Sequence, residues 1–346
     1  MAAAWFILIV LFLAAYILLD GYDLGAGVIS LFERKREVRH ATAEQVATGW
    51  DGNEVWLVLL AVGFWSGFPQ AFGVILQQLY IPIIVVLFAL VLRAFSIELI
   101  SQRGRTVNGA WYVVFGVASL VAAFAQGLAL GALTSPIALD ADGGYIGSPS
   151  DAFSWFSVLT GVTVTLGYVA LGYAFLERRG VGDLDVVARQ GRRVTVVVVI
   201  AAAICLIAIN ATAAPLDLST SVRAFAFWGL LVFAAIGAGI ALATFGRTNY
   251  DNAPRRYPFI GLAVTVVAVL GALVVSHFPL LVPPDITVYS AAGPTSTLWF
   301  LFVAVGLTMP FLLVISGVAH RVFRHPASVE TDRPREPDVE GADRVL

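Results

Sequence analysis

Long apolar stretches, separated by short polar ones, run through almost the whole chain. A helix of roughly 20 apolar residues crosses a bilayer core of about 30 Å. The sequence holds nine stretches of this kind, near residues 5–31, 53–69, 77–100, 109–134, 153–177, 194–213, 222–245, 257–277 and 297–320. This pattern predicts an all-α integral membrane protein with nine transmembrane helices.

The composition agrees with a membrane location. Of the 346 residues, 59% are hydrophobic and only 13% are charged, whereas about a quarter of the residues in soluble domains carry a charge. The one cysteine, Cys205, excludes a disulfide framework and a Cys-x-x-Cys metal clip. The first apolar stretch lacks a basic leader and a cleavage signal, so it is expected to be a retained helix.

Basic residues between the apolar stretches fall on alternate loops. Nineteen of the 21 lie in the segments 32–52, 101–108, 178–193 and 246–256 or after residue 320. The opposite loops carry Arg223 and several aspartates. By the positive-inside rule, the N-terminus is expected outside and the C-terminus in the cytoplasm, as an odd number of helices requires.

The helices are expected to form one membrane domain, residues 1–325, followed by a disordered cytoplasmic tail, 326–346, with prolines and mixed charges. The first and fifth predicted helices both end in a basic segment. Because an even number of helices keeps its orientation on duplication, the chain is predicted to contain two four-helix units, 1–134 and 153–277, plus a ninth helix, 297–320.

Four acidic residues occur near the inner ends of the first two predicted helices. Asp20 and Asp23 are three residues apart and so lie on one helix face, as do Asp51 and Glu54. Asp20 lies roughly 22 Å along its helix, where a carboxylate costs about 2.5–3.5 kcal/mol on insertion scales. Because burial of an acid is so unfavourable, an acidic residue within a membrane helix indicates a function. We therefore predict that these four residues form a route for proton uptake from the cytoplasm.

The same residues also fit structural roles. Asp51 would stabilise the start of the second helix as a cap, and Asp20 and Asp23 would pair with Arg93 or with loop arginines. Arg93 lies five residues before Glu98 in the third helix, where a guanidinium needs an acidic or anionic partner. We expect Arg93 and Glu98 to serve in pairing within the membrane or in contact with a partner.

Ligands for a haem or another metal are scarce. Within the predicted helices, only His277 and Met309 could serve as axial haem ligands. His277 ends the eighth helix at the outer surface, whereas Met309 lies roughly 18 Å below the outer end of the ninth. The two cannot share one iron, so this chain alone is expected to bind no haem and to hold no metal site.

Two motifs carry a resemblance to a known family. Leu19-Asp-Gly-Tyr-Asp-Leu-Gly25 is followed, after a short basic loop, by Trp50-Asp-Gly-Asn-Glu-Val-Trp-Leu57. In this order and spacing they resemble the signature of subunit II of the cytochrome bd-type quinol oxidases. Ser276-His-Phe-Pro279 and the nine-helix length extend the similarity almost from end to end of the chain.

The resemblance implies quinol oxidation with reduction of dioxygen to water in the inner membrane of a bacterium. A low-spin b, a high-spin b and a d haem are expected in a homologous partner, subunit I, and no catalytic residue is expected in this chain. The family assigns Asp51 to the proton path, beside Asp20 and Asp23. Trp50 and Trp56 of the second motif are expected to pack within the membrane or against the partner.

Further partners follow from the same resemblance: small single-span accessory subunits, membrane lipid and quinone, but no nucleic acid. Some family members hold a tightly bound structural quinone in subunit II, and no motif locates such a site here. The chain is thus predicted to be the non-haem subunit of a terminal quinol oxidase, supporting assembly and proton delivery. The alternative is a proton-coupled secondary transporter, since such a protein also needs buried acids.

The predicted topology can be checked by cysteine labelling. A cysteine introduced at Ser148 should react with an impermeant thiol reagent added from outside, because the loop 135–152 is expected to be external. A cysteine introduced at Ser101 should stay unlabelled, because the loop 101–108 is expected to be cytoplasmic. The opposite pattern would reverse the orientation.

Overall fold

The computed structural model describes residues 1–134, 137, 139–140, 144–212, 216–247, 256–283 and 285–322. Its α-helices are α1 (Ala2–Phe32), α2 (Arg36–Ala47), α3 (Trp50–Gly67), α4 (Pro69–Gln78), α5 (Tyr80–Arg103), α6 (Ala110–Ala132), α7 (Trp155–Arg179), α8 (Leu184–Ala208), α9 (Ser221–Thr244), α10 (Tyr257–His277) and α11 (Thr295–Val322). The shorter elements are the 3-10 helices η1 (Gly104–Thr106), η2 (Pro149–Ala152) and η3 (Ile209–Ala211) and the antiparallel strands β1 (Leu280–Val282) and β2 (Ile286–Thr287). The predicted tail, 326–346, lies outside the described residues.

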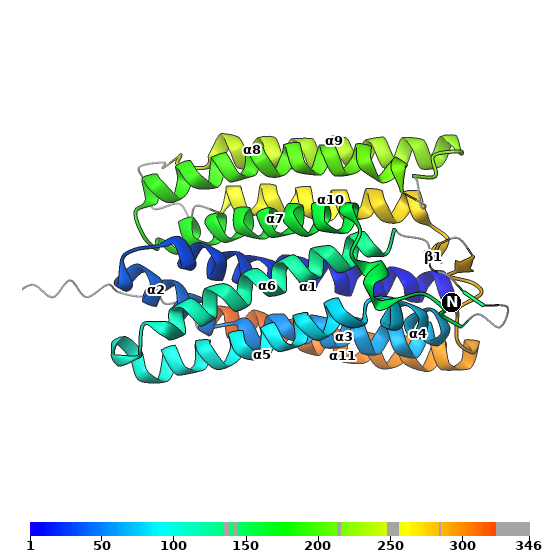
Figure 1. The fold of residues 1–346 in the computed structure, drawn as a ribbon, viewed down its shortest axis with the longest axis horizontal. Helices are drawn as coiled ribbons and strands as arrows, with labels where there is room; N and C mark the ends of the chain where they lie inside the picture. The colour runs from blue at the N-terminus through cyan, green and yellow to red at the C-terminus, as the bar shows by residue number, and fades with distance from the viewer. Residues whose placement is uncertain are drawn as a thin grey trace, which may run out of the picture.

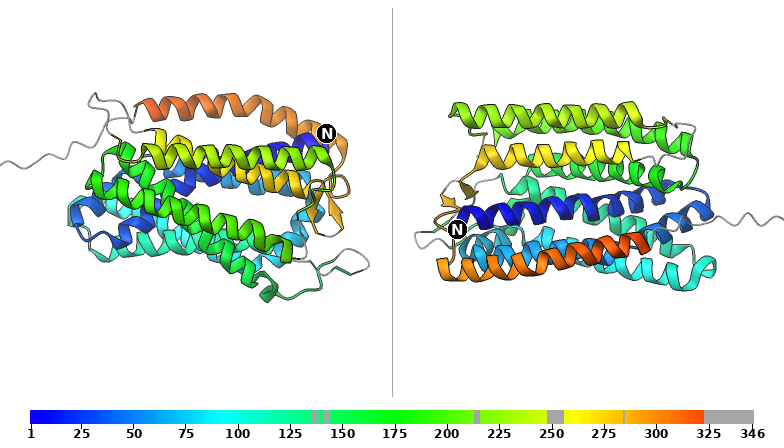
Figure 2. Two further views of the ribbon diagram at one scale, coloured as in Figure 1. Left: turned by 90° about the horizontal axis from the view of Figure 1, so that it is seen from above. Right: turned by 180° about the vertical axis from the view of Figure 1, so that it is seen from behind.

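The long helices run nearly parallel to the long axis of the molecule (Figure 1, Figure 2). The N-terminus and β1 lie at one end of the bundle, and α2 lies at the other. In Figure 1, α8 and α9 form one edge, followed by α7 and α10, and α3, α5 and α11 form the opposite edge. α1 lies between these edges and contacts α2, α3, α6, α7, α10 and α11, so it is the helix around which the others are arranged.

Seven of the described helices are long and apolar enough to cross a membrane: α1, α5, α6, α7, α8, α9 and α10. An all-helical membrane protein is therefore confirmed. The other two predicted spans correspond to α3, with 18 residues, and α11, with 28. At 1.5 Å per residue, α3 is about 27 Å long. The count of nine spans remains a prediction.

Two basic segments predicted as loops are largely helical. α2 occupies the basic segment after α1, and α8 begins at Leu184 rather than near residue 194. An apolar-length criterion misses these turns because charged residues continue a helix beyond the hydrocarbon core. The start of α8 is set by Asp183, whose side chain accepts hydrogen bonds from the backbone N–H groups of Asp185 and Val186.

α1 and α7 cross at close range through glycines. A Cβ added to Gly25 would lie 1.8 Å from the backbone oxygen of Tyr168, and one added to Gly172 would lie 2.5 Å from the backbone carbon of Gly25. Gly21 leaves room for the ring of Tyr168, which would lie 2.7 Å from an added Cβ. Small residues at such positions let two backbones approach each other. This crossing holds the part of α1 that carries Asp20 and Asp23 against α7.

Aromatic side chains join the first half of α1 to α3. Trp5 is buried against Gly67, and its Nε1 donates a hydrogen bond to the backbone oxygen of Gly63 at 3.0 Å. Phe12 contacts Trp56 with the ring centroids 6.3 Å apart. The two antiparallel helices are thus held together at this end by packing, and their opposite halves are joined by polar contacts.

Substitution of Gly25 tests the crossing of α1 and α7. Gly25→Ala should force the helices apart, because the obstacle is backbone, and should destabilise the protein by about 1–3 kcal/mol or more, as overpacking does. Thermal unfolding in detergent measures the loss. Gly167→Ala is the matched control on α7, since nothing lies within 4 Å of an added Cβ there. Equal stability of the two variants would contradict the close crossing.

Candidate functional site

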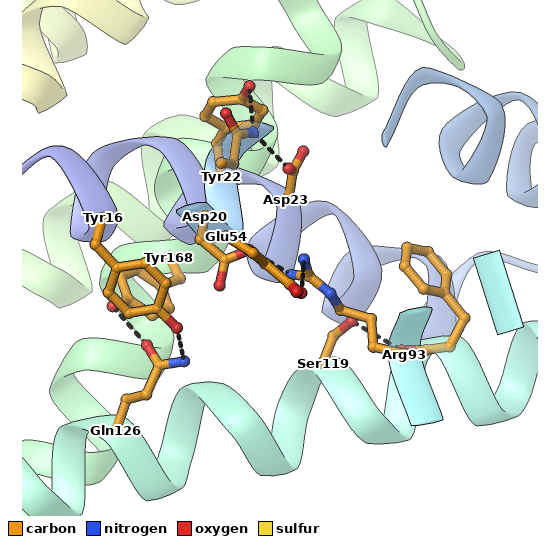
Figure 3. Close-up of polar contacts among 11 residues, drawn as sticks. Tyr16, Asp20, Tyr22, Asp23, Glu54, Arg93, Ser119, Gln126 and Tyr168 are labelled. Atoms are coloured by element: carbon orange, nitrogen blue, oxygen red, sulfur yellow. Dashed lines mark hydrogen bonds and ion pairs between the residues drawn. The ribbon is translucent and has the colours of Figure 1, made fainter. Parts of the chain in front are cut away.

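The buried guanidinium of Arg93 contacts acidic side chains of two other helices (Figure 3). Arg93 Nη1 on α5 lies 2.7 Å from Asp20 Oδ1 on α1, and Arg93 Nη2 donates to Glu54 Oε1 on α3 at 3.0 Å. Asp20 and Arg93 are fully buried, whereas the side chain of Glu54 keeps 25% of its surface exposed. Glu54 therefore connects the buried ion pair with the surface of the chain.

Asp23, three residues after Asp20, is held by a neutral partner. Asn53 Nδ2 on α3 donates to Asp23 Oδ2 at 2.7 Å and to the hydroxyl of Tyr22 at 2.9 Å. Asp23 and Asn53 are both buried, and Tyr22 stacks on Phe175 of α7 with the ring centroids 4.6 Å apart. The Asn53 amide thus fixes the second acid of α1 close to the first.

A second set of polar side chains lies on the other side of Asp20 from Arg93 (Figure 3). Gln126 Nε2 on α6 donates to the hydroxyl of Tyr16 on α1 at 2.7 Å, and the hydroxyl of Tyr168 on α7 donates to Gln126 Oε1 at 3.0 Å. Both tyrosines are buried. These two hydrogen bonds connect α1, α6 and α7 next to the acidic cluster.

The acidic cluster holds more acids than bases. Asp20, Asp23 and Glu54 surround Arg93, the one basic side chain that the described residues place among them. A buried charge costs several kcal/mol unless it is paired, and one guanidinium balances one carboxylate. Ionisation of all three acids would leave two uncompensated negative charges. The cluster can therefore bind and release protons around Arg93, whose own charge is permanent.

Comparison with known proteins decides the family. Residues 1–323 match the family described as cytochrome bd terminal oxidase subunit II. The chain belongs to this family. Cytochrome bd ubiquinol oxidase subunit 2 of Bacillus subtilis (strain 168) is 30% identical over 336 residues, 94% of this chain and 96% of that protein. Cytochrome bd-I ubiquinol oxidase subunit 2 of Escherichia coli (strain K12) is 25% identical over 200 residues, 56% of this chain and 53% of that protein.

The fold is also found in a solved structure. The bd oxidase from Geobacillus thermodenitrificans matches with a TM-score of 0.75 at 17% identity, over 93% of this chain and 98% of that chain. As a bd subunit II, the chain is a multi-pass bacterial membrane protein and a subunit of a terminal oxidase, an oxidoreductase of respiratory electron transport. Membership of the family does not favour the alternative of a secondary transporter.

Asp51 lies three residues before Glu54 on α3, but the described ion pairs of Arg93 are with Asp20 and Glu54. Asp51 lies in the first turn of α3 with an exposed side chain, and Gly49 rather than Asp51 occupies the N-cap. The interpretation of Asp51 as the cap is therefore wrong, although its charge lies at the positive end of the helix dipole. The assignment of Asp51 to the proton path in this bd subunit stays a prediction.

The predicted pairing residues are also separated. Glu98 is exposed and accepts a hydrogen bond from Gln102 Nε2 at 2.6 Å, while the acids that reach Arg93 in the described residues are those of α1 and α3. Trp50 and Trp56 are partly buried against two different clusters of the apolar core. Contact of these tryptophans with the partner subunit stays a prediction.

Two of the described histidines make hydrogen bonds within this chain. His40 uses both ring nitrogens, Nδ1 with the hydroxyl of Tyr112 and Nε2 with Glu44 Oε1, each at 3.1 Å. His277 Nδ1 lies 2.9 Å from the backbone oxygen of Leu273 in its own helix. Within the described ranges, no group of three or more acidic, histidine or cysteine side chains is arranged to hold a metal ion.

The amide and hydroxyl groups of the site were not predicted from the sequence. Gln126 is a lone amide in an apolar helix, and the cost of burying it is the same kind of signal that marked Asp20. Asn53 lies inside the second motif, but its bond to Asp23 depends on how α1 and α3 face each other. Tyr16 carries no comparable signal, because tyrosines are common in membrane helices.

Removal of the guanidinium tests whether the cluster depends on it. Arg93→Leu should destabilise the protein by about 3–5 kcal/mol, because it leaves Asp20 and Glu54 without their cation. Thermal unfolding and membrane yield measure the effect. The double variant Arg93→Leu with Asp20→Leu should recover much of the loss, and the exposed control Glu98→Gln should be close to the native protein. A stable Arg93→Leu protein would contradict the central role of this ion pair.

Proposed function

We propose that this chain delivers protons from the cytoplasm to the oxygen-reducing site of its partner, subunit I, and that they pass through the acidic cluster around Arg93. The observation that carries the proposal is the placement of three carboxyl groups around one guanidinium, with one of the three, Glu54, reaching the surface. Such a cluster can exchange protons with water at its exposed member while its buried members remain shielded.

The order of the groups follows from their exposure. Asp51 is exposed in the first turn of α3 and Glu54 lies three residues later on the same helix, so a proton would pass from the first to the second. Glu54 and Asp20 bind the same guanidinium, which holds them close together. Arg93 carries no proton itself in this scheme, because a guanidinium is not deprotonated in proteins. Asp23, fixed by Asn53, is a further acceptor beside Asp20.

Orientation and partners complete the proposal. By the positive-inside rule, the basic loops favour an N-terminus outside and an inner end of α1, with Asp20, that faces the cytoplasm. The relatives from Bacillus subtilis and Escherichia coli are ubiquinol oxidase subunits by name, so a quinol is the proposed electron donor. The same proposal includes two b haems and a d haem in subunit I. It also includes single-span accessory subunits and a structural quinone in this chain. Assembly with subunit I is the second proposed role.

The contacts between helices support the proposed internal duplication. α1 contacts α3 as α7 contacts α8, α5 contacts α6 as α9 contacts α10, and α1 contacts α6 as α7 contacts α10. The helices α1 to α6 and the helices α7 to α10 would then form two units with the same arrangement of contacts. α11 would be the ninth span, outside both units. The described acidic cluster around Arg93 belongs to the first unit, which suggests that only one copy took on proton transfer.

Asp20→Asn tests the proton route. The amide cannot take up a proton as a carboxylate does, while Glu54 remains as a partner for Arg93, so the complex should still assemble. Oxygen uptake per haem should fall by about 10²-fold or more, the usual effect of losing a proton-transferring group. The measurement combines haem content per complex with oxygen uptake per haem in the purified oxidase.

Two further results decide between transfer and anchoring. Asp51→Asn should also slow turnover without loss of haem, because an amide at this exposed position leaves the helix intact but removes the first ionisable group. Loss of haem from the Asp20→Asn complex, with normal turnover per remaining haem, would show that Asp20 is only an anchor for Arg93. Normal turnover in both variants would remove the proton route from this chain.

A further inference from the structure

Three side chains from three helices lie beside Asp20 without taking part in the proposed route. They are Tyr16 of α1, Gln126 of α6 and Tyr168 of α7, here called the hydroxyl string. The two tyrosines are 3% and 4% exposed, and polar groups buried at this level in an apolar bundle are costly unless they are hydrogen-bonded. The hydrogen bonds of the string therefore compensate for burying these polar groups next to Asp20.

The hydrogen bonds of the string all point one way. Tyr168 donates to the carbonyl oxygen of Gln126, and the amide nitrogen of Gln126 donates to the oxygen of Tyr16. Because the Tyr16 oxygen accepts this bond, its own hydrogen is left to be donated to another group. Asp20 lies four residues later on the same face of α1, and its Oδ2 is buried without a hydrogen-bond partner among the described residues. The carboxylate is therefore a nearby acceptor for the Tyr16 hydrogen, which no described hydrogen bond uses.

We propose that Gln126 and Tyr168 are positioning residues that orient the hydroxyl of Tyr16 as a donor to Asp20. This inference rests on the proposed function, because it concerns how Asp20 is prepared for proton transfer. A donor fixed at one side of the carboxylate and a guanidinium fixed at the other define which oxygen remains able to take up a proton. Gln126 is suited to this role because an amide presents a donor and an acceptor at fixed ends.

Packing between α1 and α7 holds the side chain of Tyr168 in place. The ring of Tyr168 fills the space that Gly21 leaves open on α1, so the hydroxyl of Tyr168 is held by the same crossing that brings α1 and α7 together. A purely structural clamp between the three helices would use the same contacts. The two roles differ in one respect: a clamp stabilises the bundle whatever residue occupies position 20, whereas a positioning string acts only when Asp20 is present.

The test uses the complete oxidase and four variants. Tyr16→Phe and Gln126→Leu should each lower oxygen uptake per haem by about tenfold, the effect of losing a hydrogen bond to a charged group, and Tyr168→Phe should lower it less, because it acts through Gln126. Haem content should stay at the native level in all three. Tyr173→Phe is the matched control on α7: this tyrosine is partly buried and lies outside the string, so turnover should not change.

Each variant is then combined with Asp20→Asn. In that background, Tyr16→Phe and Gln126→Leu should have no further effect, because groups acting through one residue are not additive. An additional loss of equal size in the double variants, or loss of haem in the single ones, would show a structural clamp and overturn the inference. Native turnover in Tyr16→Phe and Gln126→Leu would overturn it as well. Native turnover in Asp20→Asn alone would instead refute the proton route on which the inference rests.

Discussion

The ion pair between Arg93 and Asp20 is the interaction on which the rest of the site depends. Neither charge could be buried alone, since an unpaired charge in the hydrocarbon core costs several kcal/mol. The long side chain of Arg93 joins α5 to α1 through this pair, and its second bond, to Glu54, joins α3 to the same point. One cation thus connects three helices of the first unit and holds two of the carboxyl groups close together.

The glycines of α1 make this arrangement sterically accessible. Gly25 lets α7 approach α1 closely, and Gly21 admits the ring of Tyr168. Without these gaps, α1 would stand away from α7, and the hydrogen bond between Tyr168 and Gln126 would be broken. The close packing of α1 against α7 and the charge pairing of α1 with Arg93 of α5 thus act together, so that an apolar bundle holds a small polar centre.

Much of this could be predicted from the sequence, because the membrane constrains it strongly. The apolar stretches locate the long helices to within a few residues, except for the start of α8, and the cost of a buried carboxylate marks Asp20 without reference to a partner. Depth is readable from sequence, but the direction in which a side chain faces another helix is not. For that reason Glu98, only five residues from Arg93, was grouped with it although it is exposed, and Asp51 was grouped with acids that it does not join. The role of Gln126 could not be predicted, because it depends on hydrogen bonds with Tyr16 and Tyr168, which belong to two other helices.

The central claim is that the buried cluster changes its protonation during turnover and does not merely hold the helices together. Infrared difference spectroscopy between the reduced and the oxidised complex tests this directly, because a protonated carboxyl group absorbs where ionised carboxylates and amides do not. The account predicts a carboxyl band that changes with the redox state, is displaced in deuterated water and is lost when Asp20 is replaced by asparagine. A carboxyl region that is the same in both redox states, or a band unaffected by that replacement, would contradict it.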